Sequence, residues 1–445
     1  MKLSVIGTGY VGLVSGVCLA EKGHQVICVD IDQAIVTNIM AGIPTIYEKD
    51  LAPLLERNIN KNLFATSDLH QAVLDTDISL IAVGTPFDGD EIDLSYVKQV
   101  AQEIGQSLRI KEAYHMVVVK STVVPGTTDA IIVPILEKTS GKKAGSDFGV
   151  GMNPEFLREG EAVKDFMEPD RIVLGGIDEK SISMLEQLYR VFDTVKLVKT
   201  NNKTAEMIKY ASNSLLATMI SFSNEIANLC SASGDVDVVD VMRGVHMDKR
   251  LTPIMPNGKR IIPAFTTYLE AGCGFGGSCF PKDIKALISY GESIGSDMSI
   301  LNSVIKLNQT QPFEVIDLLK KHFTSLKGLR ISILGLAFKP GTDDMRESPA
   351  IPIIRYLLEN GSIIKAYDPV AQEEAKKIFK KDAINYCDSL TEVVKDSDSV
   401  ILLTCWDEFL ELPNLLGESQ SKPLIIDGRR MLDKDKFEKY EGIGL

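Results

Sequence analysis

A glycine-rich turn between a short apolar strand and a helix constrains the fold more than any other feature of the sequence. Residues 2–6 have the apolar character of a buried strand, and the chain then follows the spacing G-x-G-x-x-G through Gly12. A second apolar strand, residues 25–30, ends at Asp30, 18 residues after Gly12. In parallel α/β proteins such a turn brings the backbone close to a pyrophosphate, and the acid meets the ribose. The sequence therefore predicts a dinucleotide-binding domain.

The candidate ligands of the dinucleotide come from this turn and from the ends of later strands. Asp30 is followed by Asp32 without a neighbouring Arg, and these carboxylates would repel a 2'-phosphate, so we expect NAD rather than NADP. Further strands at 78–83 and 115–120 end in polar residues, which should gather at the same edge of the sheet. The candidate cofactor residues are Gly7, Gly9, Tyr10, Val11, Gly12, Asp30, Thr85, Pro86 and Thr122. Thr122 is equally well explained as an ordinary cap or turn hydroxyl.

The same pattern returns near the C-terminus. Residues 329–335 have the pattern of a strand that opens into a turn, a helix capped by Ser348 begins at Pro349, and a strand at 363–368 follows. This second turn lacks G-x-G-x-x-G. Its loop 338–348 carries a lysine and an arginine, which favours either a phosphorylated ligand other than a second dinucleotide or a solvated loop with surface ion pairs.

The chain is therefore expected to be an α/β protein with two doubly wound Rossmann-like domains joined by a helical middle domain with one long central helix. A length of 445 residues suits about three domains. The expected boundaries are residues 1–200 for the NAD-binding domain, 201–312 for the central helical domain with the cysteine-containing loop, and 313–445 for the second Rossmann-like domain.

Composition narrows the class of function. The net charge of -13 argues against nucleic acid or an anionic membrane as the main partner, although an anionic small ligand needs only a local basic pocket. The seven cysteines are scattered without a C-x-x-C pair, which predicts a reducing cytoplasm and no metal site. The apolar run 4–20 contains four glycines and leads into another strand, so we do not interpret it as a signal peptide, and no other segment is long and apolar enough to span a membrane.

Cys279 stands in the segment that points most directly to covalent chemistry. Residues 274–283 read Gly-Phe-Gly-Gly-Ser-Cys-Phe-Pro-Lys-Asp, so small residues crowd the approach to the sulfur. Pro281 fits the first position of a helix, which places the thiol at the positive end of the helix dipole and near Lys282, and both favour the nucleophilic thiolate. The alternative is a buried structural cysteine in a glycine-rich turn.

Two pairs of polar residues are candidates for work beside this thiol. Glu155 and Glu159 lie in a polar loop: if the loop becomes helical they share a face and point into a cleft, and otherwise they form a solvated acidic surface. Apolar residues at helical spacing predict one long helix over 204–230. Lys209 and Asn213 project from it side by side, either to hold an oxyanion or a water or to face solvent.

The rest of the middle segment is less regular. A second helix is expected at about 300–308. Residues 251–267 are interrupted by Pro and Gly and predict an irregular loop.

Five separated motifs together resemble the nucleotide-sugar 6-dehydrogenase family. They are the G-x-G-x-x-G turn with Asp30, residues 153–157, Lys209 with Asn213, residues 274–283, and residues 338–348. The resemblance covers essentially the whole chain. It implies NAD in the first domain, the UDP part of the substrate in the third, a homodimer across the long helix, and two successive oxidations of the sugar C6 alcohol to a carboxylate.

The resemblance also implies a covalent route. Cys279 would attack the aldehyde to give a thiohemiacetal, a second NAD would take hydride to leave a thioester, and water would hydrolyse the thioester. Lys209 would stabilise the oxyanion and Asn213 would orient it. Glu155 would serve as the acid/base in hydrolysis.

Further contacts are implied by the same resemblance. Asp283 and Thr122 would hold the water and assist proton transfer, and Arg250 would reach the site of the partner subunit. Additional cofactor contacts are Glu159, Lys282 and Arg346. The implied substrate contacts are Glu155, Phe156, Leu157, Arg158, Glu159, Lys209, Asn213, Arg250, Tyr268, Leu269, Glu270, Ala271, Gly272, Gly276 and Lys339.

The identity of the sugar is the most open part of the resemblance. The loop 251–267 is longer than in the members that this core most resembles, and this region lines their sugar pocket. The form of the cysteine motif favours UDP-glucose by analogy, with GDP-mannose and UDP-N-acetylhexosamines as alternatives. A two-electron 3-hydroxyacid dehydrogenase would share the first domain without needing Cys279, and a non-catalytic NAD-binding sensor would carry an inert Cys279.

Overall fold

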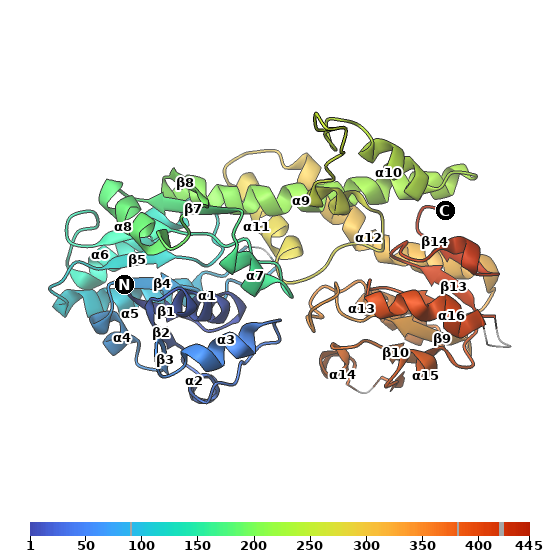
Figure 1. Ribbon diagram of the computed structural model, residues 1–445, viewed down its shortest axis with the longest axis horizontal. Coiled ribbons are helices and arrows are strands. Elements are labelled where there is room, and N and C mark those ends of the chain that lie inside the picture. The colour runs from blue at the N-terminus through green and yellow to red at the C-terminus, as the bar shows by residue number, and fades with distance from the viewer. Residues whose placement is uncertain (90, 381, 418–421) are drawn as a thin grey trace. The chain divides into compact units, whose positions relative to one another are not determined.

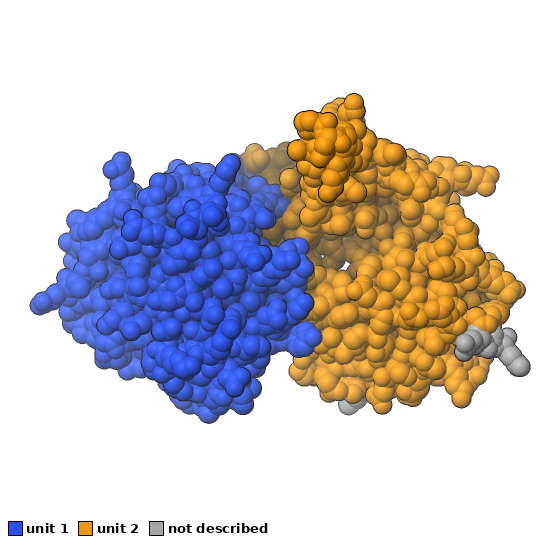
Figure 2. Space-filling model, viewed as in Figure 1, with its two compact units in different colours: residues 1–212, 285–294 blue, residues 213–284, 295–445 orange. Residues whose placement is uncertain are grey.

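The structure, a computed structural model, describes residues 1–89, 91–380, 382–417 and 422–445. The protein divides into two compact units (Figure 2). Unit 1 contains residues 1–212 and 285–294, and unit 2 contains residues 213–284 and 295–445. Two helices, α9 (Asn202–Ser233) and α11 (Phe280–Ser293), have residues in both units. The long helix α9 was predicted over 204–230, and the prediction is confirmed.

Unit 1 is built on an eight-stranded sheet in the order β3-β2-β1-β4-β5-β6-β7-β8 (Figure 1). The β6–β7 pair is antiparallel and the other neighbours are parallel. The strands are β1 (Lys2–Ile6), β2 (Gln25–Val29), β3 (Leu63–Thr66), β4 (Ile78–Ile81), β5 (Met116–Val119), β6 (Gly149–Met152), β7 (Arg171–Gly176) and β8 (Lys196–Thr200). Strands β4 and β5 are buried along their whole length, as apolar strands of a doubly covered parallel sheet should be.

The helices of unit 1 form two contacting groups, α1 with α3 and α7, and α4 with α5 and α6. Two such groups are what a doubly wound sheet requires, since its crossovers cover both faces. The helices are α1 (Tyr10–Glu21), α2 (Gln33–Met40), α3 (Leu51–Asn58), α4 (Leu69–Asp75), α5 (Ser95–Ile110), α6 (Val133–Ser140), α7 (Ala162–Met167) and α8 (Glu179–Tyr189).

Unit 2 contains a six-stranded parallel sheet in the order β11-β10-β9-β12-β13-β14. This is the Rossmann order 3-2-1-4-5-6, so the predicted second doubly wound domain is confirmed. The strands are β9 (Arg330–Leu334), β10 (Ile363–Tyr367), β11 (Ile384–Tyr386), β12 (Ser399–Leu402), β13 (Leu424–Asp427) and β14 (Tyr440–Gly442). The other helices of unit 2 are α10 (Val238–His246), α12 (Ser299–His322), α13 (Ala350–Glu359), α14 (Gln372–Phe379), α15 (Leu390–Val394) and α16 (Leu412–Gly417).

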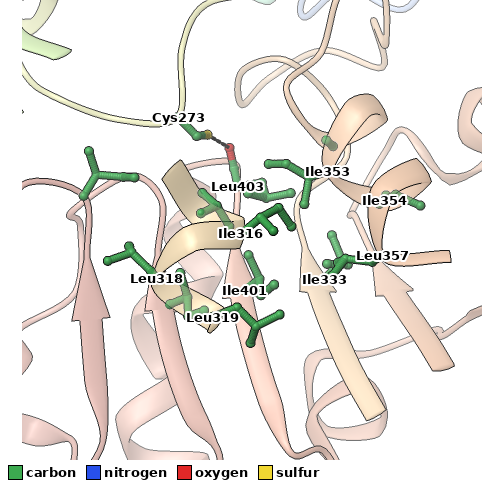
Figure 3. Close-up of a cluster of buried hydrophobic side chains, with 14 of the residues drawn as sticks. Cys273, Ile316, Leu318, Leu319, Ile333, Ile353, Ile354, Leu357, Ile401 and Leu403 are labelled. Atoms are coloured by element: carbon green, nitrogen blue, oxygen red, sulfur yellow. Dashed lines mark hydrogen bonds between the residues drawn. The ribbon is translucent and has the colours of Figure 1, made fainter. Parts of the chain in front are cut away.

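The core of unit 2 reaches the segment that precedes the predicted nucleophile. Ile316 and Leu319 of α12 pack with Ile333 of β9 in one cluster of buried side chains (Figure 3). Cys273 belongs to the same cluster, and its thiol donates to the Leu403 carbonyl at 3.9 Å. The cysteine-containing loop is therefore anchored at its start by the core of the second sheet.

Helix α12 is much longer than predicted. The sequence predicted a helix at about residues 300–308. The helix continues to His322 because Val315 and Leu319, beyond the proline, are buried in the core. It also passes through the predicted domain boundary between residues 312 and 313. The three predicted domain ranges themselves stay a prediction.

Candidate active site

The glycine-rich turn of unit 1 is open at one glycine and tightly packed at the other two. Gly7 has a φ of +91°, and a Cβ there would lie 2.8 Å from Val83. A Cβ on Gly12 would lie 1.8 Å from the Gly7 carbonyl oxygen, so only glycine allows this approach. A Cβ on Gly9 would meet no atom of the described residues within 4 Å. Because this open backbone adjoins the N-terminus of α1, the turn fits the pyrophosphate of NAD.

Asp30 fixes the shape of this turn. Its carboxylate accepts hydrogen bonds from the Thr8 N–H at 2.9 Å, from the Thr8 hydroxyl at 2.5 Å and from the Asp32 N–H at 3.0 Å. Its contact with a ribose stays a prediction. The Thr85 hydroxyl donates to the Thr122 carbonyl at 2.8 Å, so the two strand ends expected beside the nicotinamide lie together.

Glu48 connects the cofactor turn to the loop that carries the two glutamates. Tyr10, which begins α1 and precedes Val11, donates its hydroxyl to the Glu48 carboxylate. The same carboxylate accepts from the Gly160 N–H at 2.7 Å and from the Ala162 N–H at 2.9 Å. Burial and the neighbouring Glu48 raise the pKa of Tyr10, which keeps the phenol protonated as the donor. One buried acid thus ties three separate chain segments together.

Glu155 and Lys209 form a buried ion pair. Lys209 Nζ lies 2.8 Å from Glu155 Oε1, and the two side chains are 4% and 6% exposed. The carboxylate also accepts from the Leu157 N–H at 2.6 Å. Lys209 Nζ and Arg171 Cζ lie 5.6 Å and 4.0 Å from the centroid of the Phe156 ring. Two catalytic candidates from distant segments are therefore in direct contact.

The loop that carries Glu155 and Glu159 is irregular, not helical, and helix α7 begins only at residue 162. Residues 153–158 are not helical, and Gly160 has a φ of +81°, outside the range of a right-handed helix. The shared helical face is therefore wrong. A solvated acidic surface is equally excluded, because both glutamates are buried.

Lys120, directly after β5, is a buried lysine beside this ion pair. Its ammonium donates to Asn153 Oδ1 at 2.9 Å. Burial lowers the pKa of Lys120 to about 8, and the charge of Lys209 adds to this effect while Glu155 opposes it. Burial would raise the pKa of Glu155, but Lys209, the Leu157 N–H and Lys120 together bring it below its ordinary value. Glu155 is therefore held as a carboxylate.

In unit 2, Cys279 immediately precedes α11. Its carbonyl accepts the Asp283 N–H at 2.8 Å as the first hydrogen bond of the helix, which begins at Phe280, one residue before the predicted Pro281. The sulfur lies 3.5 Å from Ser278 Oγ, and the side chain is half-buried. The thiol therefore stands at the positive end of a helix dipole and outside the core, which argues against a buried structural cysteine.

Asp283, four residues after Cys279 on α11, is a buried acid. It is 1% exposed, accepts from Asn213 Nδ2 at 2.7 Å, and pairs with Lys282 Nζ at 2.7 Å. Asn213 lies on α9, one helical turn after Lys209. Lys282, expected near the thiol and the cofactor, thus directs its ammonium to Asp283.

The cysteine-containing loop packs directly on the turn of the second Rossmann-like domain. A Cβ on Gly276 would lie 2.3 Å from the Glu347 carbonyl oxygen, and one on Gly277 would lie 2.8 Å from the Phe338 ring. The Gly277 N–H donates to the Arg346 carbonyl at 2.8 Å. Glycine at these positions permits the close contact, so the cysteine-containing loop and the loop 338–348 pack directly against each other.

Asp368 shows why the second domain differs from the first. It stands at the end of β10, as Asp30 does after β2, but it is fully buried. Its carboxylate accepts from four backbone N–H groups, those of residues 336, 337, 370 and 371, and from Trp406 Nε1 at 3.2 Å. An acid this fully bonded is poorly placed to bind a ribose, as predicted from the missing glycine pattern.

The remaining candidate residues are placed as follows. Three arginines pair with nearby acids: Arg158 with Asp165 at 2.6 Å, Arg250 with Asp248 at 2.5 Å, and Arg346 with Asp344 at 2.8 Å. Leu269 and Ala271 are buried, Glu270 is exposed, and the Gly272 N–H donates to Asn224 at 2.8 Å. Tyr268 lies 6.3 Å from Phe280 between ring centroids, Lys339 Nζ lies 5.8 Å from the Phe338 centroid, and Pro86 follows Thr85 after β4. Their ligand contacts stay predictions.

The catalytic candidates divide between the units. Unit 1 holds Thr122, Glu155 and Lys209, and unit 2 holds Asn213, Cys279 and Asp283. Sequence reasoning missed Lys120 and Glu48, whose partners lie 33 or more residues away along the chain. The one sign in the sequence that could have pointed to them is a single charged residue next to an apolar strand, for Lys120, or next to an apolar helix, for Glu48.

Neither a metal site nor a membrane span was found in the parts of the chain that the structure describes. No group of three or more His, Cys, Asp or Glu residues in the described ranges is arranged to hold a metal ion. None of the described helices is long and apolar enough to cross a membrane.

Comparison with known proteins places this site in a family. Models of the UDP-glucose/GDP-mannose dehydrogenase family match the chain at residues 1–193 (NAD binding domain), 203–310 (central domain) and 332–434 (UDP binding domain). The UDP-glucose 6-dehydrogenase AglM of Haloferax volcanii is 41% identical over 448 residues, with 100% of both chains covered.

Two solved structures are similar over the full length. That of a UDP-glucose dehydrogenase from the hyperthermophilic archaeon Pyrobaculum islandicum is 39% identical, with a TM-score of 0.89 and coverage of 100% of this chain and 97% of that one. The UDP-D-ManNAc dehydrogenase from Pyrococcus horikoshii is 27% identical, with a TM-score of 0.83 and coverage of 100% and 99%. The chain belongs to the UDP-glucose/GDP-mannose dehydrogenase family.

Proposed function

We propose that this enzyme oxidises C6 of UDP-glucose to the carboxylate of UDP-glucuronate through a thioester on Cys279. The activity is that of an NAD-dependent UDP-glucose 6-dehydrogenase. The observation that carries the covalent route is the thiol at the start of α11, one turn before the buried pair of Asp283 and Asn213. The proposal requires that these groups and the Glu155–Lys209 pair act on the same carbon.

In the first oxidation, C6 loses a hydride and its hydroxyl loses a proton, which leaves an aldehyde. When bound, NAD accepts the hydride that leaves C6 in each of the two oxidations. The ammonium of Lys209 stabilises the negative charge that develops on the C6 oxygen, and the Asn213 amide orients it. A water held by Asp283 and Thr122 takes the proton.

The second oxidation is covalent. Cys279 Sγ bonds to the aldehyde carbon, and its proton passes to the new C6 hydroxyl, which gives a thiohemiacetal. Loss of a second hydride from C6 and of the hydroxyl proton leaves a thioester. Water then adds to the thioester carbonyl, the C–S bond breaks, and the thiol and a carboxylate are released together with one proton. One sulfur thus allows a single site to perform a four-electron oxidation.

Glu155 is the proposed acid/base of the hydrolysis. The ion pair with Lys209 holds it as a carboxylate, which is the form needed to take a proton from the attacking water. Lys209 at the same time supports the oxyanion of the tetrahedral intermediate. Both residues are buried, so their charges act in a site with little competing solvent.

The nucleotide half of the substrate belongs to unit 2. Residues 332–434 match the UDP binding domain, and the cysteine-containing loop packs on its first turn. We assign Lys339, Gly276 and the segment 268–272 to UDP-sugar contacts. The direct packing of the two loops supports this assignment, because UDP bound at the turn would bring its sugar toward the thiol.

UDP-glucose is the proposed sugar nucleotide rather than GDP-mannose or a UDP-N-acetylhexosamine. The full-length relatives named for UDP-glucose are 41% and 39% identical, against 36% for a GDP-mannose dehydrogenase and 27% for the one named for UDP-D-ManNAc. To test this, NADH formation should be measured with UDP-glucose, GDP-mannose and UDP-N-acetylglucosamine in parallel. We expect kcat/KM for UDP-glucose to exceed the others by roughly 100-fold, and equal values would overturn the assignment.

The enzyme is further proposed to be a cytoplasmic homodimer that pairs through α9. Leu215, Phe222 and Leu229 recur every seven residues on this helix, and each is more than half exposed. A seven-residue apolar repeat suits helix pairing, and a second copy presents the same seam by two-fold symmetry. All seven cysteines are free thiols, which supports a reducing compartment.

A further inference from the structure

Lys120 is a charged group in a place where a charge is costly. It is 3% exposed at the end of β5, and transfer of an ammonium into such surroundings is tolerated only with polar partners. Its ammonium donates to Asn153 Oδ1 at 2.9 Å and lies 5.8 Å from the centroid of the Phe166 ring. The acid that opposes the lowering of its pKa is Glu155.

Asn153 connects Lys120 to the loop that carries Glu155. Its Oδ1 accepts from Lys120 and from the Tyr189 hydroxyl at 2.5 Å, and its Nδ2 donates to the Val173 carbonyl at 2.9 Å. The side chain is therefore fixed from α8, from β7 and from the end of β5. Glu155 follows Asn153 by two residues, so the backbone that leads to Glu155 starts from a fixed side chain.

Glu155 is influenced by charges from two elements. Lys209 of α9 contacts it directly, and Lys120 at the end of β5 adds a second positive charge nearby. Its own loop contributes the Leu157 N–H, and Arg171 lies over the adjacent Phe156 ring. Two positive charges favour the ionised form of this carboxylate, although burial opposes it.

We propose that Lys120 is a positioning residue for Glu155, which it fixes through Asn153 and holds in the ionised form together with Lys209. This inference rests on the proposed acid/base role of Glu155. It differs from a purely structural role because it predicts that removal of the Lys120 charge changes the protonation of Glu155.

Lys111 provides a matched control. It is also buried in unit 1, and its ammonium is bonded to the carbonyls of residues 73, 74 and 76, away from Glu155. Lys120→Met and Lys111→Met each remove one buried ammonium, and both should lower the melting temperature. Only the first should affect Glu155.

The test is the pH dependence of kcat for the two-NADH reaction, measured in Lys120→Met, Lys111→Met and Lys120→Arg. We expect Lys120→Met to move the acid limb of the kcat–pH profile to higher pH by about one unit, because Glu155 loses a nearby positive charge that favours its ionised form. Lys111→Met should keep the wild-type limb, and Lys120→Arg should restore it. An unmoved limb in Lys120→Met would overturn the proposal.

A second measurement covers the case in which Lys120→Met does not fold. In protein with 13C-labelled lysine, the Lys120 signal should titrate near pH 8, and Glu155→Gln should lower its midpoint because coupling is reciprocal. An unchanged midpoint would contradict the proposal. The kinetics of Glu155→Gln separate the two ideas: if this variant keeps the wild-type acid limb, the acid/base role of Glu155 fails instead.

Discussion

Asp283 concentrates several interactions in one side chain. Its carboxylate bonds the Asn213 amide and the Lys282 ammonium and is almost completely buried. Asp283→Asn keeps the shape but removes the charge, so we expect kcat to fall by about 10²–10⁴-fold, the range for loss of a group that assists proton transfer. Steady-state kinetics should be compared with Asp240→Asn, which removes an exposed ion pair with Arg243. Similar kcat values in the two variants would contradict this role.

The glycines of the cofactor turn make a separate prediction. Gly12→Ala places a methyl group 1.8 Å from the Gly7 oxygen, so we expect a loss of about 1–3 kcal/mol in the free energy of unfolding. Gly9→Ala points into open space and should unfold like the wild type, yet bind NAD more weakly, because the methyl group occupies the approach of the pyrophosphate. Thermal melts and NAD titrations check both variants. Normal NAD affinity in a folded Gly9→Ala would contradict the placement of the pyrophosphate.

At the level of single residues, the sequence predicted the positions that a local motif defines by itself. Cys279 at a helix start was predicted from Pro281 and the glycines, and Asp30 from its distance to Gly12. Lys120 was missed because its surroundings are created by Asn153 and Glu155, which only the folded chain brings close. A pattern in sequence shows where a lysine stands but not that the fold has buried it.

Helix α9 carries a buried acid that should make stability depend on pH. Glu206 accepts from the Gly126 N–H at 2.5 Å and the Thr128 N–H at 2.8 Å, and burial raises its pKa to about 7. The folded chain therefore holds a proton that the unfolded chain releases near pH 4.3, so stability falls as pH rises from 5 to 7.

The comparison with Glu206→Gln isolates this effect. Over that range the free energy of unfolding of the wild type should drop by about 2 kcal/mol relative to the variant, which cannot ionise. Denaturant titrations at several pH values measure the difference. Parallel pH dependences would contradict the raised pKa.

At the scale of elements, helices and strands with clear periodicity were predicted well, and boundaries set by tertiary packing were not. The long helix α9 was predicted nearly to its ends. Helix α12 was predicted to stop near residue 308, whereas core contacts beyond Pro312 extend it. The conditional helix through Glu155 was wrong because the buried ion pair and the Leu157 N–H hold that loop in an irregular path.

For the whole molecule, the two doubly wound sheets followed from the repeated strand and turn pattern. The antiparallel pair β6–β7 did not, because strand direction is set by the connection, which sequence periodicity does not record. The family resemblance, and not the strand pattern, indicated that the first domain binds NAD and the last binds UDP, and the family models support this.

A charged residue in the exposed apolar repeat of α9 (Leu215, Phe222 and Leu229) tests the proposed dimer. Phe222→Glu would bury a carboxylate in the interface, so we expect dissociation to monomers in sedimentation experiments at micromolar protein. Ile110→Glu, at an exposed position on α5, is the matched control and should leave the assembly unchanged. A dimeric Phe222→Glu variant would move the interface elsewhere.

One enzyme is proposed to carry out both oxidations through Cys279. The most direct measurement is the number of NADH molecules formed per UDP-glucose with limiting sugar and excess NAD, for the wild type and for Cys279→Ser. We expect two NADH and UDP-glucuronate from the wild type, and no UDP-glucuronate from the variant, because serine does not form the thioester. One NADH per sugar in the wild type, or a variant that still yields two, would rule out the thioester on Cys279.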